Sequence, residues 1–411
     1  ASRSSRNESP GSAQPGVAEC QRSNAKATLR RRLRSRIVGV VARTRRPRLP
    51  QRQIAAATAG GGAGVPVAVE GLGRRRAGGA APVTTGPLQQ MPTMASDLDR
   101  VEEGLRLAVR STNPFLTEIA GHLIAAGGKR VRPGFCIASA ATAHVEDIAA
   151  AADVIDGAVA VELVHLGSLY HDDVMDDAEI RRRVESVNAK WGNLKAILAG
   201  DFLLARASEI AASLGTEVAG LLAATIGRLC EGQVLELQYT YDVTRTEESY
   251  LRAIEGKTAA LLSAACRIGG LVSNRPRAEI AALTDFGRSY GMAFQIVDDV
   301  LDLVSTEDEI GKPVGHDLVA GVYTMPVIRA LATPAGHELG ALLGSPLAPP
   351  EVEKAREMVR SSGTVEEAIS VARTHAVTAQ QALAMLAPST GTTGLVAAAD
   401  HLVEVVEQAA A

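Results

Sequence analysis

Residues 154–175 are apolar on nearly every helical face, and no other feature constrains the fold of this chain as strongly. A helix that is hydrophobic all round belongs inside a bundle, where neighbouring helices cover each of its faces. Further apolar helical patterns follow at 194–214, 218–237, 259–272 and 280–303. They are not accompanied by the alternation of Val, Ile and Thr that indicates strands. The sequence therefore predicts a single all-α helical bundle.

The composition fits closely packed helices. Aromatic residues make up 3% of the 411-residue chain, and Trp191 is its one tryptophan. The core must therefore be built from Ala, Leu, Val and Ile, of which Ala and Leu favour helices. We expect the polar, glycine-rich stretch 305–323 to be irregular and about three more helices to follow it. No uninterrupted apolar run approaches the roughly 18 residues of a membrane span, so none is predicted.

Residues 1–93 differ sharply from the rest of the chain. They contain 17 Lys+Arg and 3 Asp+Glu, a net charge of +14. Their apolar residues follow no helical or strand period, so they cannot bury enough surface to fold. Three interpretations stay open: a disordered basic tail, an organellar transit peptide, or a start assigned too early. We favour a true start at Met91 or Met94, because helical periodicity begins at Asp97, and we take 94–411 as the folded domain.

The folded part is acidic. Residues 94–411 hold the remaining 26 basic and 43 acidic residues, a net charge of −17. Binding to nucleic acid needs a basic surface, so nucleic acid is not an expected partner. The cysteines, Cys20, Cys136, Cys230 and Cys266, show no metal-binding spacing. They are typical of reduced thiols in a cytoplasmic protein, and only a real transit peptide would indicate an organelle.

The strongest chemical signal is an acidic motif, DDVMDD, which begins at Asp172. Asp172 and Asp176 lie four apart on one helical face, and Asp173 and Asp177 lie on the neighbouring face. Carboxylates stacked in this way repel one another unless cations neutralise them. The arrangement suits Mg²⁺, which takes oxygen ligands and keeps places for water and substrate phosphates. The alternative is an ordinary solvated acidic helix end.

A second motif with the same spacing weakens that alternative. The run DDVLD at 298–302 again closes a very apolar segment, and Gln295 precedes Asp298 by one helical turn. Two such ends that face each other across a bundle could hold one metal-bound anionic group between them. His165 lies two turns before Asp172, where a buried core role and a ligand role are equal alternatives.

Cationic groups accompany the acidic motifs at several separate places. They are Lys129, Arg130 and Arg132 in GGKRVRP, the run Arg181-Arg182-Arg183, Lys257 in GKT, and Lys312 in the irregular stretch. Arginine offers a planar fork for phosphate oxygens, and lysine offers a compact charge. Each group alone is a weak signal. Together with the acidic motifs they predict a pocket for a metal-bound diphosphate and a second diphosphate.

These motifs, in this order, resemble the trans-isoprenyl diphosphate synthases, or polyprenyl synthetases. The resemblance covers most of 97–411. It is carried by GGKRVRP at 127–133, ELVHLGSLYHDDVMD at 162–176, GDFLLARA at 200–207, GKT at 256–258, FQIVDDVLD at 294–302 and GKPVGHDL at 311–318. It implies the isoprenoid synthase fold, an all-α bundle with a central active-site cavity, in a protein that is usually a homodimer.

The resemblance also implies an activity. A bacterial geranylgeranyl or longer-chain synthase is expected, which joins isopentenyl diphosphate head to tail to an allylic prenyl diphosphate and releases diphosphate. The product would be an all-trans polyprenyl diphosphate. Several Mg²⁺ ions would act in each active site, with Mn²⁺ as the alternative metal.

Residue roles follow from the same resemblance. Direct Mg²⁺ ligands would be Asp172, Asp176 and Asp298, supported by Asp173, Asp299 and Asp302. Contacts to the allylic diphosphate would be Arg181, Lys257, Thr258, Gln295 and Lys312, with Lys257 also catalytic. The isopentenyl diphosphate site would be Lys129, Arg132, His165 and Arg182.

Two further inferences depend on this resemblance. The chain departs from the family's usual residues at Arg183, at 184–186 and at Val322, and the last removes one expected cation near the diphosphate. The floor of the tail cavity often lies four and five residues before the first acidic motif. Ser168 and Gly167 stand there, and both are small. The sequence thus predicts a product longer than farnesyl diphosphate.

Three alternatives compete with a synthase. A class I terpene cyclase would share the first acidic motif but typically has a different metal motif at the second position. A non-catalytic partner subunit of a heteromeric synthase tends to lose one acidic motif, whereas both are present here. A plain helical scaffold leaves the paired spacing unexplained.

Overall fold

The computed structural model describes residues 86–144, 147–306, 314–334 and 336–410. Most of the basic segment 1–93, and with it the predicted tail, lies outside these ranges. The packed body begins before residue 94, because Leu88 and Met91 are buried in the core. Both side chains lie against Gly394 near the C-terminus, so residues 86–93 belong with the bundle.

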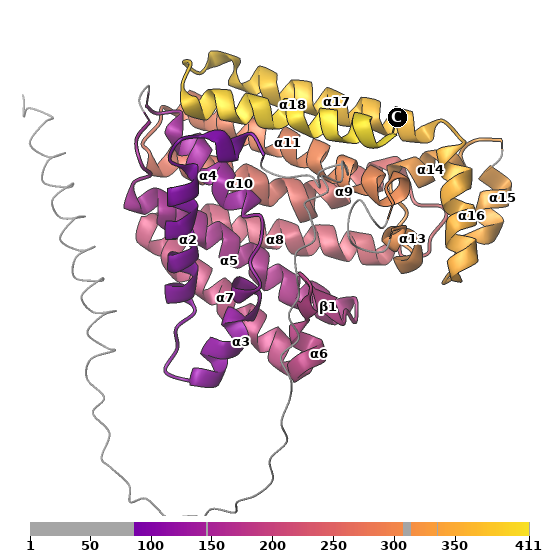
Figure 1. Cartoon of the computed structure of the whole chain (residues 1–411), viewed down its shortest axis with the longest axis horizontal. Helices are drawn as coiled ribbons and strands as arrows, with labels where there is room; N and C mark the ends of the chain where they lie inside the picture. The colour runs from indigo at the N-terminus through magenta and orange to yellow at the C-terminus, as the bar shows by residue number, and fades with distance from the viewer. Residues whose placement is uncertain (1–85, 145–146, 307–313, 335, 411) are drawn as a thin grey trace, which may run out of the picture. The chain divides into compact units, whose positions relative to one another are not determined.

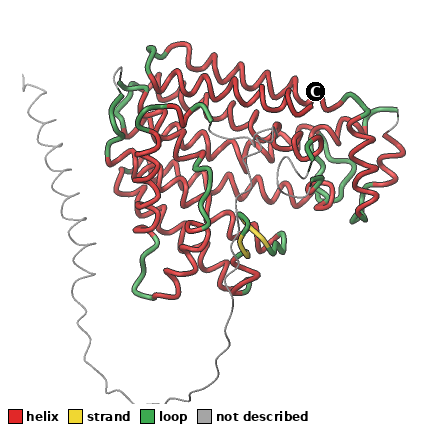
Figure 2. Tube along the Cα trace, in the orientation of Figure 1, coloured by secondary structure: helices red, strands yellow, loops and turns green. Residues whose placement is uncertain are grey.

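Helices form nearly all of the described chain (Figure 2). They are η1 (Leu88–Gln90), α2 (Met94–Ala108), α3 (Pro114–Ala125), α4 (Val131–Ala141), α5 (Ala152–Met175), α6 (Val187–Trp191), α7 (Asn193–Leu214), α8 (Thr216–Gln238), α9 (Glu247–Ile254), η2 (Glu255–Ala259), α10 (Ala260–Val272), α11 (Arg277–Val304), α13 (His316–Ala320), α14 (Met325–Leu331), α15 (Gly336–Leu342), α16 (Pro349–Arg360), α17 (Thr364–Ala382), η3 (Leu383–Met385) and α18 (Thr390–Ala410). The predicted all-α class is confirmed.

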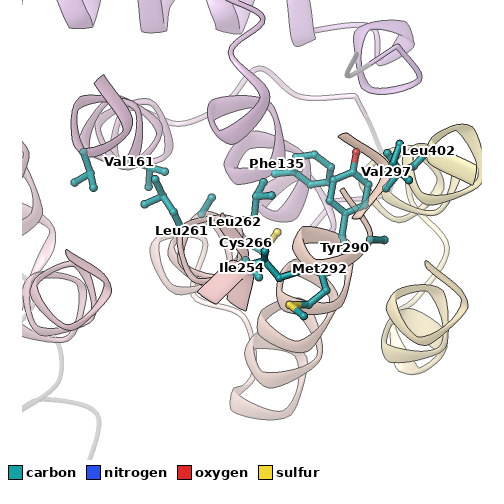
Figure 3. Packing of buried hydrophobic residues seen from close by; sticks show 14 of the residues in the cluster. Phe135, Val161, Ile254, Leu261, Leu262, Cys266, Tyr290, Met292, Val297 and Leu402 are labelled. Carbon is teal, nitrogen blue, oxygen red and sulfur yellow. The ribbon is translucent and has the colours of Figure 1, made fainter. Parts of the chain in front are cut away.

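The long apolar helices form the centre of the bundle (Figure 1). Helix α10 packs against α4, α5 and α11, while α5 also packs along α7 and α11 along α17. Figure 3 shows Phe135 of α4 beside Tyr290 of α11, with ring centroids 4.4 Å apart. Few other large rings are available, so Ala, Leu and Val fill most of the core, as the composition predicted.

Two glycines let α5 and α7 approach closely. A Cβ atom on Gly200 would come within 2.4 Å of the His171 ring, which no real Cβ tolerates. A Cβ on Gly167 would lie 3.1 Å from the Leu204 side chain. The close approach packs the end of α5, which carries the first acidic motif, against α7. Close-packed helices resist displacement, so the motif is held in place.

Local signals explain where several helices begin. Asn113 accepts hydrogen bonds from the backbone of Phe115 and Leu116 at the start of α3, and Pro114 takes the first helical position. Ser186 caps α6, and Thr246 caps α9 by accepting from the backbone N–H of Ser249.

The structure differs from the sequence prediction in its C-terminal helices and in short elements. Five α-helices, α14 to α18, follow residue 323 in the described chain, where about three were expected. Strands β1 (Ile180–Arg181) and β2 (Val184–Glu185) form an antiparallel hairpin. Its turn residues, Arg182 and Arg183, have φ of 54° and 64°, as a type I′ turn requires. This turn normally carries Asn or Gly, so three arginines gave no turn signal. The stretch 305–323, predicted to be irregular, contains helix α13.

Within the described ranges, α8 is the one helix long and apolar enough to cross a membrane, by length and composition only. It packs against α7 and α10 within the bundle. Its last turns carry Gln233 and Glu236, which line a polar cavity. The helix therefore has a structural role in the bundle that explains part of its apolar surface.

Candidate active site

The two acidic motifs meet at one cavity of about 670 Å³. Asp172 and Asp176, from the C-terminal end of α5, line one side, and Asp298 and Asp299 of α11 line another. The sequence predicted that these helix ends face each other, and the structure brings them together.

Other elements complete the cavity wall. They contribute Gln233 and Glu236 of α8, Arg245 and Tyr250 at the start of α9, Lys257 and Thr258 of η2, and the segment 316–324 that includes His316, Asp317, Val322 and Thr324. The element η2 is a single turn of π-helix. Such turns are rare inside helical proteins and frequently mark functional sites.

Three carboxyl groups of this cavity, those of Asp172, Asp299 and Asp317, have a raised pKa. Burial raises the pKa of Asp172 to about 6, although Lys257 opposes the shift. Burial raises the pKa of Asp299 to about 7, against the hydrogen bonds from Tyr250 and Gln295. The pKa of Asp317 is raised well above its ordinary value by burial and by the nearby Asp299. A cation in the cavity would reverse these shifts, because it favours the charged carboxylates.

Two further aspartates support the walls without lining the cavity. Asp173 accepts a hydrogen bond from Arg181 Nε at 2.6 Å, and Asp302 accepts one from the backbone N–H of Asp317 at 3.1 Å. In the described part of the chain, Asp173 Oδ2 and Asp302 Oδ1 are buried without a hydrogen-bond partner. Buried carboxylate oxygens of this kind favour a donor or cation, because leaving them unpaired costs free energy.

No three His, Cys, Asp or Glu side chains among the described residues already converge on a single point as a ready metal site. The carboxylates instead stand on opposing walls. Mg²⁺ is usually bound through one or two carboxylates together with waters and substrate phosphates. The donor set therefore fits metal ions that reach full coordination only when an anionic substrate is present.

A hydrogen-bonded chain orients Asp299. Thr258 Oγ1 donates to Gln295 Oε1 at 2.6 Å, and Gln295 Nε2 donates to Asp299 Oδ1 at 2.7 Å. Tyr250 Oη donates to the other Asp299 oxygen at 2.6 Å. Thr258 and Gln295 were predicted to contact substrate, and both do line the cavity, but here they bond to each other.

Lys257 projects from the π-helical turn into the cavity, where it pairs with Glu236. Burial alone would lower the pKa of Lys257, but Glu236 and Asp172 outweigh that effect and raise it. The ammonium group therefore stays charged in the cavity, available to an anion.

The hairpin sends its three arginines in different directions. Arg181 lines the cavity and pairs with Asp173. Arg182 donates to the carbonyl oxygens of Leu123, at 3.2 Å, and of Gly127. Arg183 is exposed. The tight turn at Arg182 and Arg183 directs neighbouring side chains to different sides. The sequence did not predict this turn.

A second basic cluster lies around Glu162. Arg130 Nη1 lies 2.8 Å and Arg182 Nη2 3.8 Å from Glu162 Oε1. Burial lowers the pKa of Arg132, with Glu162 opposing the shift, and the Arg132 Nε is buried without a partner in the described chain. Burial, followed by Arg132 and the other arginines, lowers the pKa of His165 well below its ordinary value, so its imidazole is neutral at pH 7.

The structure thus brings together Arg132, Arg182 and His165 of the second predicted site. Lys129 lies exposed in the loop before α4. Lys312 lies outside the described residues. Arg130, which was not assigned a role, takes a left-handed backbone conformation with φ 48° and turns its side chain into the cluster. Arg130 also donates from its Nε to the Glu102 carboxylate. Three arginines around two carboxylates, Glu162 and Glu102, leave an excess of positive charge, which favours an anion.

The residues predicted to set product length lie one turn below the motif. Gly167 is buried against α7, and Ser168 is partly exposed with its hydroxyl donating to the His165 carbonyl at 2.9 Å. Neither lines the 670 Å³ cavity, which Leu169 does. Their role stays a prediction.

Several cavity residues had no predicted role, among them Glu236, Arg245, Tyr250 and Asp317. Asp317 stands within GKPVGHDL and was the easiest to find. Glu236 lies at the end of an apolar helix, where a single acid gives no pattern. Arg245 and Tyr250 come from an irregular segment and a short helix, and only tertiary packing brings them to the site.

Comparisons with known proteins agree with this site. The family model described as polyprenyl synthetase matches residues 113–360. The nonaprenyl diphosphate synthase of Mycobacterium tuberculosis is 40% identical over 74% of this chain and 91% of its own length. The heptaprenyl diphosphate synthase component 2 of Bacillus subtilis is 36% identical over 74% of this chain and 87% of its own. A crystal structure of a polyprenyl synthase from Caulobacter crescentus CB15, complexed with calcium and isoprenyl diphosphate, superposes with a TM-score of 0.72 at 31% identity, covering 80% of this chain and 99% of that one.

Proposed function

Because the chain belongs to the polyprenyl synthetase family and is a prenyltransferase, we propose that its two acidic motifs act together to ionise an allylic prenyl diphosphate in the cavity between α5 and α11. The observation that carries this proposal is the convergence of both motifs, with Lys257 and Arg181, on one cavity. Residues that share a cavity wall can act on the same diphosphate group.

The metal in this proposal is Mg²⁺, with several ions per site and Mn²⁺ as the alternative. Asp172, Asp176 and Asp298 would hold it, and Asp299 and Asp302 would support them. Burial raises the pKa of Asp172 and of Asp299, and a cation would stabilise the charged form of such buried carboxylates, which supports a cation site. When bound, the metal supplies charge that stabilises the departing diphosphate. The calcium in the structure of the Caulobacter crescentus relative supports a divalent ion.

Cationic side chains would hold the same diphosphate from the other walls. Arg181 and Lys257 line the cavity, and both are paired with carboxylates that lie at its edge. An incoming diphosphate would compete for these cations and take the charge-assisted hydrogen bonds. Gln295 and Thr258 would orient Asp299, and Lys312 remains a predicted contact.

The second diphosphate, that of isopentenyl diphosphate, is assigned to the cluster of Arg132, Arg182 and His165, with Lys129 at its exposed edge. The excess of buried positive charge around Glu162 supports this assignment. Neutral His165 can donate one hydrogen bond to a phosphate oxygen without adding a further charge among the arginines.

The reaction then needs no nucleophilic side chain. The C–O bond of the allylic diphosphate breaks and leaves an allylic cation. The double bond of isopentenyl diphosphate attacks that cation to form a new C–C bond. A proton then leaves the neighbouring carbon, and the released diphosphate is the base that takes it. Arg181 and Lys257 stabilise negative charge as it develops on the leaving group, and the protein walls keep water from the cation.

We further propose that the active protein is a homodimer. Helices α7 and α8 pack against each other. On these two helices the side chains of Leu194, Leu198 and Val234 are more than half exposed. Exposed apolar side chains on neighbouring helices support a protein interface there. We also propose a cytoplasmic location, because the three cysteines of the described ranges, Cys136, Cys230 and Cys266, are free thiols.

A product assay tests the proposed function. The full chain is incubated with Mg²⁺, labelled isopentenyl diphosphate and, in turn, dimethylallyl, geranyl, farnesyl and geranylgeranyl diphosphates. Elongated products that disappear when EDTA removes the metal support the proposal. A folded chain that elongates no starter contradicts it and favours a subunit that needs a second component, as the words "component 2" suggest for the Bacillus subtilis relative.

A further inference from the structure

Arg245 lines the cavity wall and has no role in the mechanism proposed above. It is 4% exposed and lies in the segment between α8 and α9. Its side chain lines the cavity that holds both acidic motifs. Among the described residues, its Nε and Nη2 atoms are buried and have no hydrogen-bond partner. A buried guanidinium group with unpaired N–H groups is costly, so the protein retains it for a reason.

The backbone around Arg245 is held firmly in place. The side chain of Asp242 accepts hydrogen bonds from both the backbone and the hydroxyl of Thr244, at 2.8 and 2.6 Å. Thr246 on the other side caps α9. A turn before the residue and a helix cap directly after it leave Arg245 little conformational freedom, so its side chain is preorganised at the cavity.

The same segment is bonded to the wall that contains α13. The Tyr241 backbone N–H donates to the Gly321 carbonyl at 2.8 Å, and the Tyr241 hydroxyl donates to the Val319 carbonyl at 2.9 Å. Arg245 Nη1 donates to the Tyr323 carbonyl at 3.0 Å. One side of the guanidinium is thereby fixed, and its remaining N–H groups are left for another acceptor.

No carboxylate of the described chain lies within ion-pair distance of Arg245. Burial lowers the pKa of Arg245, and Glu236, Asp299 and Asp317 oppose that shift. The Tyr250 ring lies 5.6 Å from the guanidinium carbon. The guanidinium stays protonated under all ordinary conditions. The cavity therefore contains a buried, permanently charged fork with free donors, which matches the geometry of phosphate oxygens.

Val322 adjoins this group and lines the same cavity. It is bonded in the chain to Tyr323, whose carbonyl fixes Arg245, and it carries no charge. A cation introduced at position 322 would therefore enter the same region of the cavity as the Arg245 side chain.

We propose that Arg245 binds the diphosphate of the allylic substrate through its unpaired N–H groups and is a specificity-determining residue for that substrate. This inference rests on the proposed function of the cavity. It assigns the Arg245 guanidinium to the cavity shared by the two acidic motifs, and not to the second basic cluster around Glu162.

Steady-state kinetics of the full chain with farnesyl and isopentenyl diphosphates test the inference. Arg245→Met removes the donors while keeping an apolar side chain of similar length. It is expected to lower kcat/KM for farnesyl diphosphate by about 10- to 100-fold, as loss of hydrogen bonds to a charged group does. The KM for isopentenyl diphosphate should change less than twofold. When Val322→Lys is added to this variant, kcat/KM for farnesyl diphosphate should rise at least tenfold.

The matched control is Arg275→Met. Arg275 also has a buried, unpaired Nε in the described chain, but it lies beside Glu279 at the start of α11 and outside the cavity. Its substitution should leave the kinetics with both substrates unchanged. Should Arg245→Met fail to fold, Arg245→Lys keeps the charge without the fork and should show a smaller loss confined to farnesyl diphosphate.

Calorimetric titration with inorganic diphosphate and Mg²⁺ supplies a readout that needs no turnover, and Arg245→Met should weaken this binding about tenfold or more. The inference is overturned if the folded variant keeps its farnesyl kinetics within twofold, or if both substrates lose equally and Val322→Lys restores neither. An inactive wild-type enzyme would contradict the proposed function instead, and the titration would then still decide the role of Arg245.

Discussion

Gly291→Ala should separate the π-helical turn from α11 and so disable the site without touching a charged residue. Gly291 is buried on α11. A Cβ atom there would lie 2.5 Å from the Ala259 Cα atom and 2.9 Å from its Cβ. Ordinary van der Waals contact needs 3.4–4 Å, so the two backbones must move apart by roughly 1 Å. Ala259 follows Thr258 directly, and the shift therefore pulls Lys257 and Thr258 away from α11.

Two magnitudes follow from this geometry. Forcing a methyl group into a packed contact costs about 1–3 kcal/mol of unfolding free energy, and the higher helix propensity of Ala returns up to about 1 kcal/mol. The net loss is at most about 3 kcal/mol. A displacement of about 1 Å in a catalytic constellation can reduce turnover by about 100-fold. The hydrogen bond of 2.6 Å between Thr258 and Gln295 should break first.

The assay combines thermal unfolding with the rate of farnesyl diphosphate elongation. Gly121→Ala is the matched control, because that helical glycine lies on α3 and a Cβ there would be 4.0 Å from the Val109 side chain, an ordinary contact. It should raise stability by about 0.5–1 kcal/mol and leave activity unchanged. A Gly291→Ala enzyme with wild-type activity and melting temperature would refute the proposed coupling between helix packing and the site.

Three further outcomes are expected. Ser168→Phe should shorten the product distribution, since an aromatic ring one turn below Asp172 would block the growing tail; unchanged product length by chromatography would exclude Ser168 from the floor. The pKa of His165 is lowered well below its ordinary value of 6.5 in the folded protein. The unfolded chain therefore binds a proton at His165 at a pH where the folded protein does not, and the free energy of unfolding falls as the pH drops below 6.5. His165→Asn should flatten this fall in denaturant titrations between about pH 6.5 and 5, and an identical slope would contradict the assigned burial. Leu198→Asp should lower the mass measured by light scattering from dimer to monomer, and an unchanged dimer would move the interface away from α7 and α8.

Periodicity predicted the long helices well because their apolar faces are wide. The expected segments 194–214 and 280–303 differ from α7 and α11 by at most a few residues at each end. The convergence of the acidic motifs was also predictable, because few positions within one bundle accommodate the charged ends of two apolar helices. Each of these inferences depends on patterns that are local in sequence.

What the sequence did not predict depends on tertiary packing. Arg245 comes from a segment whose position is fixed by hydrogen bonds to the chain around Gly321, nearly eighty residues later. The hairpin that separates Arg181 from Arg182 uses left-handed arginines in place of Asn or Gly. The pairing of Thr258 with Gln295 joins two helices that no sequence spacing relates. Side chains of this kind can be assigned only when the neighbouring element is known.

In the proposed mechanism the two diphosphates occupy separate sites, one at the acidic cavity and one at the cluster around Glu162. Equilibrium binding to variants of the full chain tests it most directly, with a non-ionisable thiodiphosphate analogue of farnesyl diphosphate and with isopentenyl diphosphate. Asp298→Asn should abolish Mg²⁺-dependent binding of the analogue and leave isopentenyl diphosphate binding intact, whereas Arg132→Met should do the reverse. Equal loss of both ligands in either folded variant would contradict two separate sites and the account built on them.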